Sequence, residues 1–200
     1  MFGQLSTTQK LMGAFFATLL VAVFGGVVFY FFPSASNQGY APEQPIPFSH
    51  KLHSGDNQIS CRYCHSGAWE SQHANVPSLN VCMNCHTVVK TESPHIQRMI
   101  SSYEAGKPIE WIRVHELPDH ARFNHSRHVK KGVSCETCHG DVKKMDKVEQ
   151  FAPLTMGWCL SCHRGQEVPS KVLSNVRPGE NPEDIKGEPI APFGCATCHY

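Results

Sequence analysis

The sequence lacks the residue sets that most enzyme classes require. No Ser/His/Asp set, phosphate-binding loop or pair of catalytic carboxylates stands out in its 200 residues, so hydrolytic and nucleotide-dependent functions have no candidate site. The formal net charge is only +1, which gives the polypeptide no electrostatic attraction for nucleic acid. No cysteine lies outside one repeated motif, so none is left over for a structural disulfide.

That repeated motif is Cys-x-x-Cys-His. It is the attachment signature of c-type haem, in which two thiols bind the porphyrin covalently and the adjacent histidine ligates the iron. Zinc sites need four ligands, usually from two Cys-x-x-Cys knuckles, and give no reason for a histidine after every pair. The sequence therefore predicts five covalently bound haem c groups, at Cys61, Cys64 and His65; Cys82, Cys85 and His86; Cys135, Cys138 and His139; Cys159, Cys162 and His163; and Cys195, Cys198 and His199.

The chain is short for five haems. Outside its apolar N-terminal run only about 32 residues remain for each of them, which is too few to wrap each cofactor in its own pocket. The 14 prolines and 15 glycines indicate a loop-rich shell,. We therefore expect a multihaem cytochrome c fold, loop-rich with short helices around a haem core, plus one N-terminal transmembrane helix.

Residues 11–32 form an uncharged apolar run of 22 residues. As a helix it spans about 33 Å, enough to cross a bilayer once. A cleaved secretory signal is the alternative, since Ser34-Ala35-Ser36 could serve as its cleavage site, although signal cores are shorter. Haem is attached outside the cytoplasm, so we expect a single-pass protein of the bacterial inner membrane with its haem domain on the periplasmic side.

The remaining chain is an internal duplication. Phe48-Ser49-His50-Lys51-Leu52-His53 is echoed by Phe123-Asn124-His125-Ser126-Arg127-His128, and two haem motifs follow each copy at nearly the same offset,. A helix is expected near Ser93–Glu104, because Ser93-Pro94 is a typical helix start. The predicted organisation is a cytoplasmic N-terminus (1–10), an anchor (11–32), a tether (33–46), a first two-haem module with a linker (47–122), a second two-haem module (123–164), and an extended loop with the fifth motif (165–200).

Eight histidines outside the motifs are available as sixth iron ligands. The repeated Phe-x-His-x-x-His pairs are the leading candidates, because i, i+3 spacing puts two imidazoles on one side of a helical turn. His50 and His125 would serve the haems at Cys61 and Cys135, while their partners His53 and His128 would reach haems attached later in the chain.

The fifth distal ligand is open between two residues. His115 is the best remaining histidine, and Met156 competes because a thioether ligand would raise the haem potential. His73, His95 and His120 are assigned to solvent or to contacts with haem propionates. Six-coordinate iron has no open position for a substrate, so no catalytic site of the chain's own is expected. The functional alternatives are an electron-transfer wire, a multihaem periplasmic reductase and a tetrahaem-type quinol dehydrogenase.

The ordered motifs resemble a known family. The stretches PFSHKLHSGDNQISCRYCH, PIEWIRVHELPDHARFNHSRHVKKGVSCETCHG, LTMGWCLSCHR and CATCHY follow an N-terminal anchor, as in the pentahaem cytochrome c subunit of alternative complex III, a quinol:electron-acceptor oxidoreductase. The resemblance covers nearly the whole chain. In its Phe-x-His-x-x-His pairs the family is similar to the small multihaem c3/c7 cytochromes, which implies a c3/c7-like fold. It implies a relay that takes electrons from a polytopic quinol-oxidising membrane subunit through an iron–sulfur subunit. It implies delivery to a monohaem cytochrome c or another periplasmic acceptor, in a respiratory or photosynthetic chain.

Overall fold

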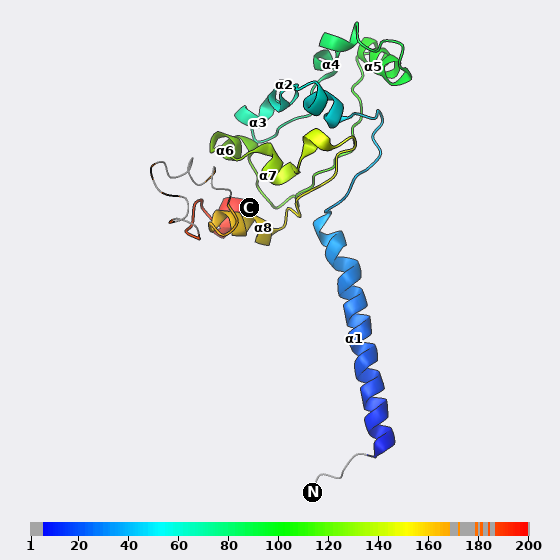
Figure 1. The fold of residues 1–200 in the computed structure, drawn as a ribbon, viewed down its shortest axis with the longest axis vertical. Helices are drawn as coiled ribbons and strands as arrows, with labels where there is room; N and C mark the ends of the chain where they lie inside the picture. The colour runs from blue at the N-terminus through cyan, green and yellow to red at the C-terminus, as the bar shows by residue number, and fades with distance from the viewer. Residues whose placement is uncertain are drawn as a thin grey trace.

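The structure, a computed structural model, describes residues 6–168, 172, 179, 181, 184 and 187–199, without the side chains of residues 32–35. Its most prominent feature is a long N-terminal helix, α1 (Thr7–Ser36), which projects from a small domain of short helices and loops (Figure 1). Ser6 caps the helix start by accepting a hydrogen bond from Gln9 N, and the Gln9 side chain accepts one from Ser6 N in return,.

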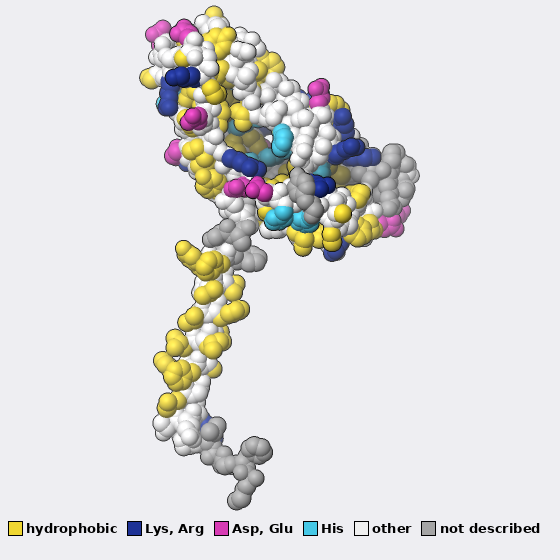
Figure 2. All heavy atoms as spheres, turned by 180° about the vertical axis from the view of Figure 1, so that it is seen from behind, with side chains coloured by type: hydrophobic (Ala, Val, Ile, Leu, Met, Phe, Trp, Pro, Cys, Tyr) yellow, Lys and Arg dark blue, Asp and Glu magenta, His cyan; other side chains and the backbone are white. Residues whose placement is uncertain are grey.

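Helix α1 is exposed from Thr7 to Phe31. Its segment Thr7–Phe31 has a mean hydropathy of 2.3, none of its hydropathy window is buried, and apolar side chains cover its visible face (Figure 2). By length and composition it can cross a membrane, as the sequence predicts for 11–32. The helix continues past the candidate signal cleavage site to Ser36 and ends at Asn37, in the left-handed conformation,.

The domain confirms the expected loop-rich fold of short helices. In chain order its elements are η1, a short π-helix (Lys51–Asp56), α2 (Cys61–Cys64), α3 (Gly67–Glu70), α4 (Leu79–His86), α5 (Pro94–Glu104), α6 (His125–Lys130), α7 (Cys135–His139), the 3-10 turn η2 (Val142–Lys144), α8 (Met156–His163) and α10 (Cys195–Cys198). The predicted helix near Ser93–Glu104 is α5, with Pro94 in its first turn. The β-pairing in the described residues is one isolated bridge, Ala121 with His199.

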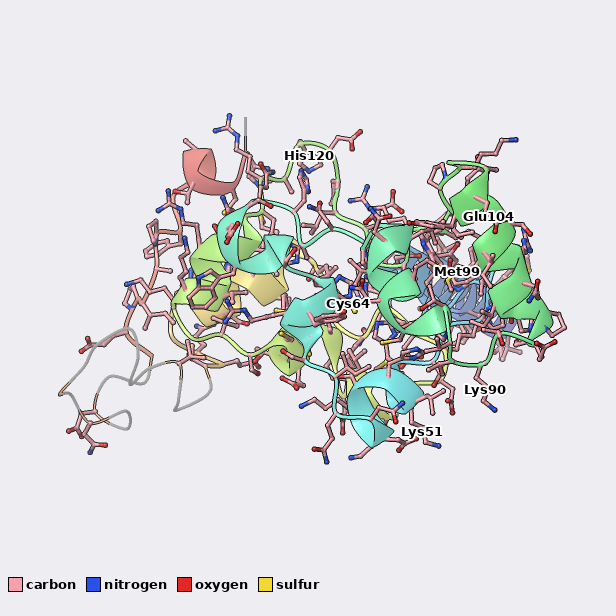
Figure 3. The ribbon with its side chains drawn as sticks, turned by 90° about the horizontal axis from the view of Figure 1, so that it is seen from above. Lys51, Cys64, Lys90, Met99, Glu104 and His120 are labelled. Atoms are coloured by element: carbon pink, nitrogen blue, oxygen red, sulfur yellow. The ribbon has the colours of Figure 1, made fainter. Side chains whose placement is uncertain are left out.

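The polypeptide's own hydrophobic core is small. Its main cluster comprises Ile46, Met83 and Met99, where α4 packs against α5. Figure 3 shows Met99 and Glu104 on α5 at one end of the domain, with Cys64 near its middle. Among the described residues the buried hydrophobics outside this cluster are Ala152 and Val172. So little apolar burial is what a fold organised around haem requires.

The predicted tether covers residues 33–46; the first four of these end helix α1, and residues 37–46 lie along the domain. Ile46 is buried in the α4–α5 cluster, and the Gln44 side chain exchanges two hydrogen bonds of 2.9 Å with the backbone of Ile112. Gln150, which is fully buried, donates to Ser36 O at the end of α1 and accepts from Glu116 N. We refer to residues 37–46 as the strap, because they join α1 to both halves of the domain.

Much of the predicted loop over residues 165–194 lies outside the described residues. Where it is described, it returns to the domain: Gly187 N donates to Gly165 O at 2.8 Å, and Ile190 N donates to His163 O at 3.0 Å. These contacts place the last motif next to the second module.

Candidate haem-binding sites

Each Cys-x-x-Cys-His motif forms one helical turn, so its two thiols share a face,. None of the ten cysteines is paired in a disulfide. Their arrangement in five pairs is consistent with about five covalently bound haems c. We number the sites in chain order: site 1 on α2 (Cys61, Cys64, His65), site 2 on α4 (Cys82, Cys85, His86), site 3 on α7 (Cys135, Cys138, His139), site 4 on α8 (Cys159, Cys162, His163) and site 5 on α10 (Cys195, Cys198, His199).

At sites 1 and 2 the motif histidine faces a histidine of the first Phe-x-His-x-x-His pair. The ring centroids of His50 and His65 are 6.4 Å apart, with only 7° between the ring planes. Those of His53 and His86 are 6.1 Å apart, with the planes at 57°. One short segment, the start of η1, therefore supplies an imidazole to each of two neighbouring sites.

The second pair repeats this arrangement at sites 3 and 4. His125 and His139 have ring centroids 6.4 Å apart and planes at 10°. His128 and His163 are 6.1 Å apart with planes at 44°. Asn124 caps α6 by accepting from Arg127 N, and α6 then holds both imidazoles.

These separations fit a metal between the rings. With a metal–nitrogen distance of about 2 Å on each side and the ring centre about 1 Å behind its nitrogen, two imidazoles on one metal have centroids about 6 Å apart. The stacked rings of Phe48 and His53 are closer, with centroids 4.4 Å apart. The described residues contain no group of three or more His, Cys, Asp or Glu side chains gathered for a metal ion. Each site instead offers two imidazoles that could ligate an iron and two thiols that could attach a porphyrin, which is what six-coordinate haem c requires.

At site 5 the facing imidazole belongs to His120. The ring centroids of His120 and His199 are 5.4 Å apart with planes at 27°, and His199 Nδ1 lies 3.3 Å from His120 O. Arg122 N donates to Cys198 O at 2.7 Å, which fixes the loop before α6 against α10. The sequence reasoning assigned His120 to solvent or propionates; its position just ahead of the second Phe-x-His-x-x-His pair was the signal available.

The two residues proposed for the fifth distal position lie elsewhere. Met156, at the start of α8, is 66% exposed. His115 lies in site 3, where it contacts the motif histidine itself: its Nε2 is 3.1 Å from His139 Nδ1, with the ring planes at 78°. His139 cannot use the same ring nitrogen for this contact and for iron.

Hydrogen bonds orient most of these rings. An imidazole whose Nδ1–H is bound to an acceptor presents Nε2 to a metal. His53 and His128 meet the carbonyl of the residue four positions earlier, at 2.8 and 2.9 Å. His125 Nδ1 lies 2.9 Å from Gln72 O, whereas His50 Nδ1 is buried with no partner among the described residues. The motif histidines of sites 1, 2 and 4 meet the carbonyls of Asn75 (2.6 Å), Val89 (3.0 Å) and Pro192 (2.6 Å).

The central imidazoles are held neutral. Burial, followed by the neighbouring His65, lowers the pKa of His50 to about 4. Burial, followed by His115 and then His125, lowers the pKa of His139 to about 3. Neutral imidazole is the form that binds a metal, so the sites are ready for ligation at physiological pH.

The thiols show which sites adjoin in the first half of the domain. Burial, and then the nearby Cys61 and Cys85, raise the pKa of the Cys64 thiol, so sites 1 and 2 lie close together. Burial and then the nearby Cys61 raise the pKa of the Cys135 thiol. Sites 1 and 3, which lie far apart in the sequence, are therefore close in space.

The second half continues the row. Burial, followed by Cys162 and Cys159, raises the pKa of the Cys138 thiol to about 11, so site 3 adjoins site 4. Burial and then Cys198 raise the pKa of Cys159, which brings site 5 beside site 4. The spatial order of the sites is 2, 1, 3, 4, 5. Figure 1 shows the corresponding helices in that order, from α4 at the end far from α1 to α8 and the C-terminus level with the end of α1.

Hollows in the domain leave room along this row. A cleft of about 410 Å³ opens beside Cys61, between η1 and Lys143. In Figure 2 the face opposite to that of Figure 1 is hollowed, with histidine side chains in and around the openings. The cysteines, imidazoles and hollows together fit haem at these positions.

Comparison with known proteins agrees with this geometry. The family described as outer membrane cytochrome MtrC/MtrF-like, domains II/IV, matches residues 56–200. The multihaem cytochrome c subunit of menaquinone reductase from Nitratidesulfovibrio vulgaris is 33% identical over 173 residues, which cover 76% of this chain and 80% of that protein. The family match spans all five motifs. The chain therefore belongs to the multihaem c-type cytochromes.

Proposed function

We propose that the protein is a membrane-anchored electron relay, with one haem c held at each of the five sites. Haem iron bound by two imidazoles carries one electron at a time and leaves no position for a substrate. The observation that carries the proposal is the facing imidazole pair at every site, with centroids between 5.4 and 6.4 Å apart. The polypeptide would hold the imidazole rings in position, exclude water from the sites and keep neighbouring sites close together.

The distal ligands we propose are His50, His53, His125 and His128 for sites 1, 2, 3 and 4, in that order, and His120 for site 5. The last differs from the sequence-based choice of His115 or Met156. It is supported by the parallel approach of His120 to His199 and by the exposure of Met156.

The order of the sites suggests the path. Electrons would enter or leave at site 2, near α4, and at site 5, near α10, and pass between the modules from site 1 to site 3. Because the end with α8 and α10 lies level with the end of α1 (Figure 1), we assign it to the partner in the membrane. The opposite end, with α4 and α5, is then free to meet a periplasmic partner.

The partner complex we propose is a quinone oxidoreductase of the bacterial inner membrane. The apolar helix α1 supports membrane attachment, and the contacts of Gln150 with Ser36 O and the strap support its retention after export. As in alternative complex III, a polytopic subunit would oxidise quinol and an iron–sulfur subunit would pass electrons to this chain. A monohaem cytochrome c or another periplasmic acceptor would receive them.

The opposite direction is the second candidate, favoured by one observation. The relative with 33% identity is a subunit of a menaquinone reductase. In that case electrons would enter from the periplasm and leave toward menaquinone. The same row of sites serves both directions, since the partners' potentials decide the flow.

The test starts from the complex purified in detergent through a tag on this chain. Menaquinol added anaerobically should reduce all the haems through co-purified subunits. Before this reduction, electron paramagnetic resonance of the oxidised complex should show that all its ferric haem is low-spin. Haem reduction by a periplasmic donor followed by menaquinone-dependent reoxidation would select the reverse direction. A high-spin haem that binds nitrite or carbon monoxide in the native protein would refute the relay and favour a reductase.

A further inference from the structure

Site 3 differs from the other four in what its motif histidine contacts. The ring Nδ1 of His65, His86, His163 and His199 lies next to a backbone carbonyl in each case. His139 Nδ1 lies instead 3.1 Å from the Nε2 of another side chain, His115. Every residue has a backbone carbonyl, so those four contacts do not depend on the acceptor's side chain. The contact at site 3 exists only because residue 115 is a histidine.

The protonation states of the two rings follow from this contact. A histidine that ligates iron through Nε2 carries its proton on Nδ1, so His139 donates and His115 accepts through Nε2. His115 must then carry its own proton on Nδ1. It is half-buried, and in this tautomer its Nε2 is free to accept.

The backbone holds His115 in place from both sides. Arg113 Nε donates to His115 O at 3.0 Å. The next residue, Glu116, donates its N–H to Oε1 of the fully buried Gln150 at 3.1 Å. His115 lies on a loop without regular secondary structure, so these two hydrogen bonds are needed to keep its ring against His139.

We propose that His115 is a positioning residue that sets the reduction potential of the haem at site 3 through its hydrogen bond to His139. When His115 accepts a hydrogen bond from His139 Nδ1–H, the His139 imidazole becomes a stronger electron donor to iron. This stabilises the ferric state of the haem and lowers its reduction potential. Site 3 lies in the middle of the row and receives electrons across the contact between the modules. The proposal rests on the proposed function, because it assigns His139 to a haem in that row.

The test compares two replacements at one position. His115→Phe keeps a ring against His139 but removes the acceptor, and His115→Gln keeps an acceptor without the ring. Each protein is matured with haem in full length and titrated potentiometrically, with electron paramagnetic resonance of the ferric state. The matched control is His95→Phe, on the exposed face of α5.

The Phe variant should show one of five potentials shifted upward and one altered low-spin signal. In the Gln variant both the potential and the low-spin signal should lie closer to those of the wild type. The His95→Phe control should leave all five potentials and all low-spin signals unchanged. Unchanged potentials in the Phe variant, or equal shifts in the Phe and Gln variants, would overturn the proposal. So would a new high-spin haem in the Phe variant, because His115 would then be an iron ligand.

Haem loading gives a further outcome. If the Phe variant and a His115→Leu variant both lose the haem of site 3 while the Gln variant keeps it, the hydrogen bond is required and the proposal stands. Loss of haem in all three variants would refute it. Failure of the underlying relay is detected separately: His125→Ala would then leave all five haems low-spin, whatever happens at His115.

Discussion

The two halves of the duplication hold their imidazoles in almost the same way. Phe48 stacks on His53 with centroids 4.4 Å apart and planes at 23°, and Phe123 stacks on His128 at 4.6 Å and 26°. Each phenylalanine also meets the first histidine of its pair edge-on at 4.8 Å. The phenylalanine in Phe-x-His-x-x-His therefore fixes both rings of the pair, which explains why it recurs with them.

The two halves also hold each other. Helix η1 of the first module packs on η2, which follows site 3, and α6 of the second packs on α3, which follows site 1. The backbone bonds correspond: Lys51 N donates to Met145 O at 3.0 Å, and Ser126 N donates to Ser71 O at 3.1 Å. Gly55 permits the first contact, because a Cβ there would collide with Lys143 O. Each histidine pair is thus anchored on the other module.

The difference lies in the hydrogen bonds behind the imidazoles. His125 Nδ1 meets Gln72 O, while the equivalent atom of His50 has no partner among the described residues. In the first module Asn75 O accepts from His65. The corresponding stretch of the second module, around Gln150, is engaged with the strap, and His139 contacts His115 instead. The duplication kept the candidate ligands and changed their surroundings, which is how similar sites acquire different potentials.

The largest predicted effect tests the likeness of the two modules. His53→Ala and His128→Ala should each convert one low-spin haem to a high-spin, carbon monoxide-binding form, because each removes one of the two imidazoles at a single site. Magnetic circular dichroism and carbon monoxide titration would count the altered haems. His95→Ala, on the exposed face of α5, is the control. Five low-spin haems in either variant would contradict its ligand assignment.

The next effect compares the two attachments of the strap, one at the buried Gln150 and one at the exposed Gln44. Gln150→Leu leaves Ser36 O, Ala152 O and Glu116 N without the side-chain partners they have in the wild type. Unsatisfied buried groups of this kind should lower the free energy of unfolding by about 3 kcal/mol. Denaturant unfolding of the haem-loaded protein in detergent would measure it.

The control for that variant lies at the other end of the strap. Gln44→Leu removes two hydrogen bonds to Ile112 that are exposed to solvent, and it should cost about 1 kcal/mol. Equal losses in the two variants would show that burial of Gln150 does not distinguish the two attachments.

A smaller effect tests the ring stacking. Phe48→Leu and Phe123→Leu each keep an apolar side chain but remove the stack on the second histidine of the pair, and each should cost about 1 kcal/mol. The two variants should lower the thermal unfolding midpoint by similar amounts. A lower unfolding midpoint in only one variant would show that the ring stack stabilises one module more than the other.

The fold class could be predicted from the sequence, because covalent haem attachment requires a recognisable motif. Five Cys-x-x-Cys-His motifs in so short a chain leave room only for loops and short helices, and the structure confirms that expectation. The Phe-x-His-x-x-His repeat could nominate His50, His53, His125 and His128, because the pattern occurs twice with the same spacing to the motifs. Their assignment as ligands stays a prediction until the irons are examined.

Sequence could not choose the partner of His199. His115, His120 and Met156 all lie within reach along the chain, and the choice depends on how the loop before α6 is pinned to α10 by Arg122 N and Cys198 O. The neighbourhood of sites 1 and 3 was likewise hidden, because it follows from the exchanged packing of η1 and α6. Both features depend on long-range contacts that leave no local pattern.

The smallest predicted effect sharpens the comparison at the start of the two histidine-bearing helices. Asn124 Oδ1 accepts from Arg127 N, and at the equivalent position Ser49 Oγ accepts from Leu52 N. Because serine and asparagine cap helices about equally well, Asn124→Ser should change the free energy of unfolding by less than about 0.5 kcal/mol, while Asn124→Ala should cost about 1 kcal/mol. Paired thermal unfolding of the haem-loaded variants would resolve the difference. If serine proved as costly as alanine, the two modules would not share their helix cap, and the orientation of His125 and His128 would depend on a contact that the first module lacks.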